Sequence, residues 1–140
     1  MTLQERKVKA SLLHGRGYNC AQCVLLSFDD CTGLDSAAAS RLAMGLGAGV
    51  GAQGEMCGSL LGMTLALGMM RGDDPKNKPQ VNAEVRELTK RFRNRNKDLY
   101  LCRELRASKF KSCDDLVADA VEILHNYLVE RNELQPDSEN

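Results

Sequence analysis

The sequence predicts an all-α fold: a single compact bundle of about five or six helices, with a Gly-rich loop before the fourth helix. Apolar residues recur at helical spacing throughout, and no segment alternates polar and apolar residues over the length of a strand. The 140 residues are 43% hydrophobic and 27% charged, which suits one soluble domain that buries its own core. We expect this helical domain to span residues 1–130 and a polar, frayed tail to follow at 131–140.

The first two helices are recognised by their ends. Residues 2–14 form the first helix, and a Gly-x-Gly sequence terminates it. The second helix begins after Asn19, a good N-cap, where Gln22 completes a capping box, and it runs to about Cys31. The expected apolar side of the first helix consists of Leu3, Val8, Leu12 and Leu13.

The next two helices flank the glycine-rich stretch 45–55. An Asp-Ser pair caps the third helix, which continues through residues 37–46. The sequence GLGAGVGAQGE then forms the loop, and an apolar fourth helix follows from about residue 56 to residue 70. The polar stretch 71–79 contains two prolines and no other apolar residue, which predicts a surface loop.

Two further helices complete the predicted bundle. The fifth helix either continues or restarts near residues 99–105. Ser112 with Asp115 forms a capping pattern that opens the sixth helix. The apolar face of the fifth helix consists of Val81, Val85, Leu88 and Phe92, and that of the sixth of Leu116, Val117, Ala120, Leu124, Tyr127 and Leu128.

Small residues line one face of the fourth helix. Gly58, Gly62 and Ala66 follow one another at intervals of four residues, so another backbone can approach this face closely. The pattern predicts either a tight contact within the chain or the seam of a homodimer. The contact within the chain is favoured, because the apolar face of this helix must be buried somewhere.

The charge balance excludes some partners. Lys and Arg together number 19, as do Asp and Glu, so we expect no nucleic-acid partner. The charged start MTLQERKVKA lacks the apolar run of a secretory signal, and the apolar stretch 56–70 is shorter than the roughly 20 residues of a membrane span. We therefore expect a cytoplasmic protein. In that reducing compartment, six cysteines favour metal binding or redox chemistry.

Three cysteines are predicted at the beginnings of helices. Cys20 and Cys113 each follow a capping residue, and Cys57 lies in the first turn of the fourth helix. The unpaired N–H groups of a helix start favour the thiolate, which is the nucleophilic and metal-ligating form of cysteine. The sign of the net pKa shift stays open, because acids at positions 55, 114 and 115 oppose the effect and Arg103 and Lys111 offset them.

The other cysteines are less distinctive. Cys102 is expected late in the fifth helical region, and Cys23 forms a C-x-x-C pair with Cys20. That spacing suits a dithiol couple or half of a tetrathiolate site. Cys31 stands alone near a helix end, where the best interpretation is a small core residue.

Four of these cysteines lie in segments that resemble a known family. The segments are NCAQCVLLSF and GEMCGSLLG, followed by the separated Cys102 and Cys113. They resemble the redox-active bacterial and archaeal proteins named for their C…GCAxxG…C…C pattern, over roughly residues 15–125. Ser59 stands where the motif has alanine, and Cys23 and Cys31 are additional.

The resemblance implies an all-helical domain, a redox role and four shared cysteines, Cys20, Cys57, Cys102 and Cys113. We take these four as the candidate catalytic, cofactor-binding and metal-binding residues. A related domain in a multihaem cytochrome carries an iron–sulfur centre, so one hypothesis is an iron–sulfur cluster for electron transfer with a redox partner protein. The other is metal-free thiol–disulfide exchange.

A second class of function remains open at this point. Four cysteines, or three with His14 or His125, would also hold zinc in a structural or regulatory module. Both histidines are nevertheless expected at the surface or at a rim.

Two further patterns are interpreted as structural. The glycines of Gly49-x-Gly51-x-x-Gly54 match a dinucleotide fingerprint but follow no strand, so we expect them to form a sharp turn near Cys57. The basic run at residues 90–97 suits a solvated helix face, or a surface for an acidic redox partner.

Overall fold

The computed structural model describes residues 1–137, which form eight α-helices and two 3₁₀ turns. The predicted all-α class is confirmed, whereas the predicted number of five or six helices is wrong. Within the described residues the β-pairing consists of one isolated bridge, between Met56 and Leu101. The elements are α1 (Leu3–Gly15), α2 (Cys20–Leu26), α3 (Asp29–Thr32), α4 (Ser36–Ala43), η1 (Met44–Leu46), α5 (Gly58–Arg71), η2 (Pro75–Asn77), α6 (Lys78–Arg95), α7 (Cys102–Ser108) and α8 (Cys113–Glu130).

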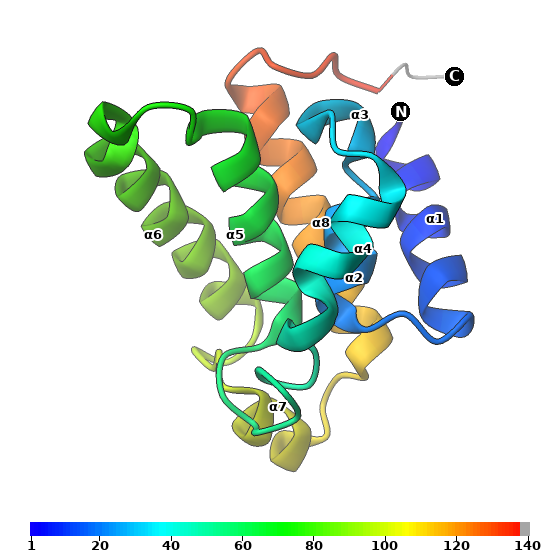
Figure 1. The fold of residues 1–140 in the computed structure, drawn as a ribbon. Coiled ribbons are helices and arrows are strands. Elements are labelled where there is room, and N and C mark those ends of the chain that lie inside the picture. Colours follow the sequence, from blue (N-terminus) through cyan, green and yellow to red (C-terminus); the bar gives the residue numbers. More distant parts are fainter. Residues whose placement is uncertain (138–140) are drawn as a thin grey trace.

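The helices α2, α5 and α8 pack against one another in the middle of the bundle. The helix α1 covers α2 and α8 on one side, and α6 covers α5 and α8 on the other (Figure 1). The N-terminal ends of α2, α5 and α8 all lie at the lower end of the molecule in this view, beside α7. Four helix beginnings therefore share one end of the bundle.

The small residues of α5 lie against α2. A Cβ atom on Gly58 would collide with the Sγ of Cys20, and one on Gly62 would lie 2.7 Å from the Cβ of Val24. The two backbones approach this closely only because these positions carry no side chain. The small-residue face is thus a contact within the chain, as the apolar pattern favoured.

Two predicted helices are shorter than expected because local hydrogen bonds compete with the helix. The Ser27 hydroxyl donates to the Val24 carbonyl at 2.7 Å, and the Ser27 carbonyl accepts from Arg6 at 2.9 Å. These bonds end α2 at Leu26, and the chain restarts as the short α3. Similarly, the third predicted helix tightens into the 3₁₀ turn η1 after Ala43.

The fifth predicted helix is interrupted and then restarts. Lys97 and Asp98 have φ values of 54° and 65°, which a right-handed helix does not allow. The side chain of Asn96 donates to the Phe92 carbonyl at 2.8 Å and closes the end of α6. The predicted surface loop at 71–79 contains the turn η2, and α6 already begins within it.

The apolar side predicted for the first helix is partly wrong. Val8 and Leu12 are about half exposed, whereas Arg6 and Ala10 are buried. Arg6 tolerates burial because its guanidinium pairs with both carboxylate oxygens of Asp30, at 2.6 and 2.7 Å. Its Nε also donates to the Nδ1 of His125 at 3.0 Å. This bonding of a buried charge determines which face of α1 turns inward.

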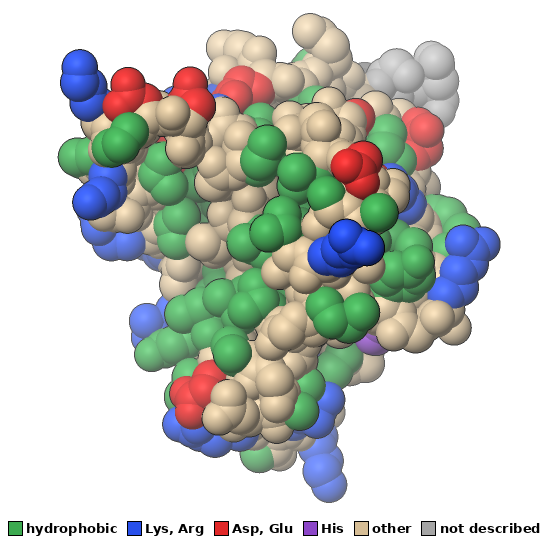
Figure 2. Space-filling model, viewed as in Figure 1, with side chains coloured by type: hydrophobic (Ala, Val, Ile, Leu, Met, Phe, Trp, Pro, Cys, Tyr) green, Lys and Arg blue, Asp and Glu red, His purple; other side chains and the backbone are tan. Residues whose placement is uncertain are grey.

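The surface carries both apolar and basic features. Figure 2 shows hydrophobic side chains gathered on the face formed by α4 and α5, where Leu42, Met44 and Met69 are exposed. Three arginines of the basic run pair with carboxylates, namely Arg91 with Glu87 and Glu130, Arg93 with Asp98, and Arg95 with Asp119 and Glu122. None of the helices at residues 1–137 is long and apolar enough to cross a bilayer.

Candidate functional site

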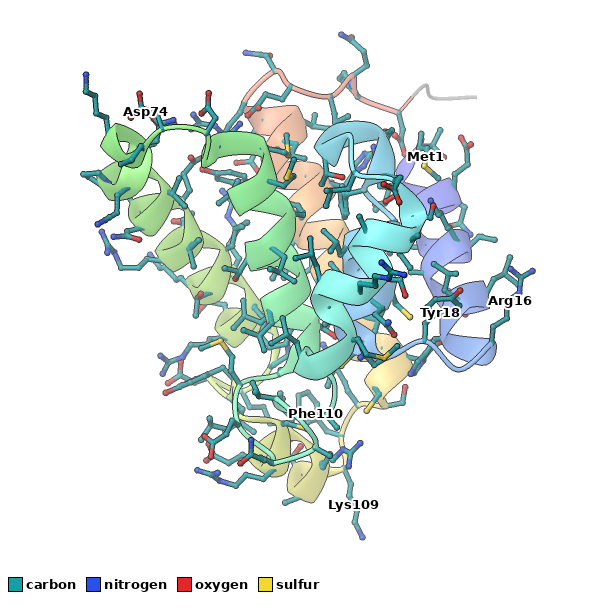
Figure 3. All side chains as sticks on the ribbon, in the orientation of Figure 1. Met1, Arg16, Tyr18, Asp74, Lys109 and Phe110 are labelled. Carbon is teal, nitrogen blue, oxygen red and sulfur yellow. The ribbon has the colours of Figure 1, made fainter. Side chains whose placement is uncertain are left out.

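A cavity of about 130 Å³ lies where α2, α5, α7 and α8 begin, and four cysteines line it: Cys20, Cys57, Cys102 and Cys113. Three of them are the first residues of α2, α7 and α8, and Cys57 is the N-cap of α5. In Figure 3 Lys109 and Phe110 lie toward this lower end, and Asp74 lies at the opposite end. The structure therefore brings together four cysteines, of which the first and the last lie 93 positions apart in the sequence.

Two capping boxes position Cys20 and Cys113. The Asn19 side chain accepts from the Gln22 N–H at 2.8 Å, and the Ser112 hydroxyl accepts from the Asp115 N–H at 3.1 Å. Asn19 also donates to the Met44 carbonyl at 3.0 Å, which ties the start of α2 to η1. Each cap fixes where its helix begins and thereby places the first side chain at the cavity.

Backbone pairing between two distant segments positions the other two cysteines. The N–H of Cys57 donates to the Tyr100 carbonyl at 2.8 Å, and the N–H of Cys102 donates to the Glu55 carbonyl at 2.6 Å. Cys102 consequently begins a helix, rather than lying late in one as expected. The sequence signal was missing because Leu101, the N-cap of α7, offers no side-chain hydrogen bond.

The glycine-rich segment forms a left-handed turn beside the cavity. Five consecutive residues, 48–52, have φ values between 51° and 76°. For a residue other than glycine this conformation costs about 1–2 kcal/mol. A Cβ atom on Gly49 would lie 2.8 Å from the Cβ of Cys102. The glycines therefore permit a sharp turn that approaches Cys102, and Ala48 of this turn lines the cavity together with Cys57.

Burial determines the protonation of two of the thiols. It raises the pKa of the Cys57 thiol to about 11, although the backbone N–H groups of Ser59 and Leu60 favour the thiolate. Burial also raises the pKa of the Cys102 thiol, against the opposing charge of Arg106. For these two cysteines the surroundings therefore favour the neutral thiol, and desolvation outweighs the helix N-terminus.

Arg106 is an arginine that lines the cavity, whereas Arg103 offsets Glu55 as expected and Lys111 pairs with a different acid from those expected. Arg103 pairs with Glu55 at 3.3 Å, and Lys111 pairs with Asp119 at 2.6 Å. Arg106 lines the cavity, and the charges of Cys102 and Cys113 raise its pKa. It lies one helical turn after Cys102, a spacing that would have identified it had the start of α7 been recognised.

One polar group in the cavity wall has no partner. Ser59 is completely buried, and its hydroxyl makes no hydrogen bond of ordinary geometry with any described residue, although it lies beside the Cys57 sulfur and favours the Cys57 thiolate, which lowers the pKa of that thiol. A buried hydroxyl without a partner costs about 1–3 kcal/mol. The cavity thus offers a hydrogen-bond donor that the protein itself does not use.

The remaining cysteines and histidines are distributed differently. Cys23 is buried outside the cavity lining, where burial raises its pKa to about 12, and Cys31 lies on α3 beside Arg6. His14 lines the cavity and lies 3.0 Å from Asp114, in agreement with a rim position. His125 is buried with Arg6, so the surface or rim position expected for it is wrong.

The cysteines lie within the described part of the chain, and all six are free thiols. Although four of them surround one cavity, no three His, Cys, Asp or Glu residues in the described range 1–137 converge closely enough to hold one metal ion. The donors therefore surround a space rather than a single point.

The fold and the site define a small helical protein with a four-cysteine cavity. Residues 18–127 match the family model described as "Putative redox-active protein (C_GCAxxG_C_C)". The match covers more than half of the chain, so this protein belongs to that family, which confirms the resemblance. No match was found among curated proteins or among solved structures.

Proposed function

We propose that this protein transfers electrons by means of an iron–sulfur cluster bound by Cys20, Cys57, Cys102 and Cys113. The observation that carries the proposal is that all four side chains line one cavity at the helix beginnings. Four cysteine thiolates are the usual ligands of such clusters, which supply reversible one-electron chemistry. Membership of a family described as redox-active supports the same role.

The chemistry of the cavity fits a cationic, sulfur-seeking group. Burial raises the pKa values of the Cys57 and Cys102 thiols, so their thiolate forms need a compensating positive charge. Bound iron would supply that charge in place of the thiol protons of Cys57 and Cys102. The unpartnered Ser59 hydroxyl adds a donor that suits a group with acceptor atoms inside the cavity.

The spacing of the donors favours a cluster over a single zinc ion. A zinc ion needs four donors within about 2.3 Å of it, and no three His, Cys, Asp or Glu residues in the described range converge closely enough to hold one metal ion. A [4Fe–4S] cluster holds its four cysteine sulfurs farther apart, because each binds a different iron atom. Zinc stays an alternative that metal analysis distinguishes directly.

Thiol–disulfide exchange is the second candidate, and Arg106 favours it. This arginine lies beside Cys102 and Cys113, and its charge lowers the pKa of Cys102 against the effect of burial. Oxidation of these two thiols to a disulfide would release two protons and pass two electrons to a bound oxidant. In this version the protein works without metal.

Anaerobic purification followed by metal, sulfide and thiol analysis tests the proposal. We expect the wild type to contain iron and inorganic sulfide and to absorb visible light. The variant Cys57→Ser should lose most of both, because it removes one ligand. The matched control Cys31→Ser should keep them, because Cys31 lies outside the cavity lining.

Other outcomes identify the alternatives. Colourless protein that gains a Cys102–Cys113 disulfide on oxidation would replace the cluster by thiol exchange. Tightly bound zinc that survives redox cycling would indicate the structural module. If Cys57→Ser and Cys31→Ser behave alike in every assay, the four-cysteine site is the wrong assignment.

A further inference from the structure

We infer that the Ser59 hydroxyl donates a hydrogen bond to the sulfur-ligated group in the cavity and raises the reduction potential of that group. The inference rests on the proposed cluster and concerns one residue of this chain. Ser59 is the second residue of α5, lies two positions after Cys57, and lines the same cavity as all four cysteines. Its side chain is completely buried and its oxygen lacks a partner among the described residues.

Several hydroxyls in helices or at their ends show one way in which such a hydroxyl is satisfied. Thr64 donates to the carbonyl of Leu60, Thr89 to Val85, Ser108 to Leu105 and Ser27, just after α2, to Val24, at 2.7 to 3.0 Å. This back-bonding is the ordinary way in which a helix satisfies such a side chain.

Ser59 does not make such a bond. The residue four positions earlier, Glu55, precedes the helix, and its carbonyl accepts the N–H of Cys102 at 2.6 Å. The hydroxyl is enclosed in the cavity wall beside the Cys57 sulfur, whose thiolate it favours, and has no acceptor of ordinary hydrogen-bond geometry. A group that fills the cavity and carries sulfur acceptors would provide one, because the sulfur atoms of a cluster accept hydrogen bonds.

Packing does not explain why a serine occupies this position. Alanine, the residue of the family motif, would fill nearly the same volume without an unpaired hydroxyl. A hydrogen bond to sulfur stabilises the more negatively charged, reduced state of a cluster, and so it raises the reduction potential. The Ser59 hydroxyl is therefore expected to change a reduction potential only when a cluster occupies the cavity.

The test compares the wild type with Ser59→Ala and with a matched control, Ser27→Ala. Ser27 is equally buried but bonds to Val24 and does not line the cavity. Each protein is reconstituted anaerobically with iron and sulfide, and its midpoint potential is measured by spectroelectrochemical titration. We expect Ser59→Ala to bind the same amount of iron at a more negative midpoint potential, and Ser27→Ala to keep the wild-type potential.

A second readout uses the metal-free proteins. Because Ser59→Ala removes an unpaired hydroxyl, its urea midpoint should equal or exceed that of the wild type. A lower midpoint would reveal an ordinary structural bond and overturn the inference. Equal iron content with an unchanged potential would also overturn it, while leaving the proposed function intact. Failure of the wild type to bind iron would instead reject both.

Discussion

Gly58 determines how closely the Cys20 sulfur can lie to α5. A Cβ atom at this position would collide with that sulfur and would lie 3.1 Å from the Leu46 carbonyl. We expect Gly58→Ala to lower the free energy of unfolding by about 1–3 kcal/mol, because a tightly packed contact must open. Urea titration measures this loss, and the cavity should also hold less iron.

Gly68 provides a matched control on the same helix. A Cβ atom there would meet nothing within 4 Å. Gly68→Ala should therefore leave the site unchanged and raise the stability by up to about 1 kcal/mol, because alanine favours the helix. Equal losses in the two variants would show that the contact with Cys20 does not matter.

Single residues also mark the limits of prediction from sequence. Cys20 and Cys113 were placed correctly at helix beginnings, because Asn19 and Ser112 carry local capping signals. Arg106 was missed, because its relation to the cysteines depends on a helix that begins without such a signal. The burial of Arg6 depends on Asp30 and His125, which lie 24 and 119 positions away. Local patterns contain no information about such partners.

Among the elements, the left-handed turn at 48–52 concentrates backbone strain, because three of its five residues are not glycine. Ala52 has a φ of 60° and is exposed, so glycine there would relieve strain without removing a packed side chain. We expect Ala52→Gly to raise the free energy of unfolding by about 1 kcal/mol, as measured by urea titration.

The same change in a right-handed helix should have the opposite sign. Ala83 is exposed within α6, and Ala83→Gly should lower the stability by about 0.5–1 kcal/mol. If both variants lose stability, the turn does not adopt the left-handed conformation in solution.

Elements with capping signals were predicted to within a few residues, and those set by tertiary pairing were not. The ends of α1, α2 and α8 near their caps agree with the sequence prediction. The start of α5 moves to Gly58 because Met56 pairs with Leu101. The start of α7 arises from the same pairing, between segments more than 40 residues apart, which helical periodicity does not reveal.

Across the whole molecule, the buried charged side chains and His125 lie away from the cysteine cavity. Glu84 on α6 bonds with Arg71 at 3.0 Å and with the Tyr127 hydroxyl at 2.8 Å, which connects α5, α6 and α8. The pair of Arg6 and Asp30 similarly connects α1 to α3. The core around these groups tolerates them because each charge has a bonded partner.

These groups make stability depend on pH. Burial and the charge of Arg6 lower the pKa of His125, so the unfolded chain binds its proton more readily. The stabilising contribution of neutral His125 is complete above the ordinary pKa of about 6.5 and is lost as the pH falls below it, by at most about 1.4 kcal/mol per pH unit. Urea titrations between pH 7.5 and pH 5.5 should show this loss.

The variant His125→Asn separates this contribution from other acid effects. Asparagine keeps an acceptor for Arg6 but does not titrate, so the dependence of the free energy of unfolding on pH between 7.5 and 5.5 should flatten.

Two carboxylates make stability fall further in acid. The hydrogen bond from Arg6 lowers the pKa of Asp30, and bonds from Arg71 and Tyr127 lower that of Glu84 despite its burial. Further loss below about pH 4.5 should therefore persist in the variant. If the free energy of unfolding depends on pH between 7.5 and 5.5 in the variant as it does in the wild type, His125 is not the origin of that dependence.

The wall of the cavity is built from residues 20 to 113, and its last sulfur begins the helix nearest the end of the chain. A ribosome that has delivered only α1 to α7 has produced three of the four sulfurs, with one side of their pocket still open to water. The four-sulfur pocket can therefore close only after Cys113 and the start of α8 have been synthesised.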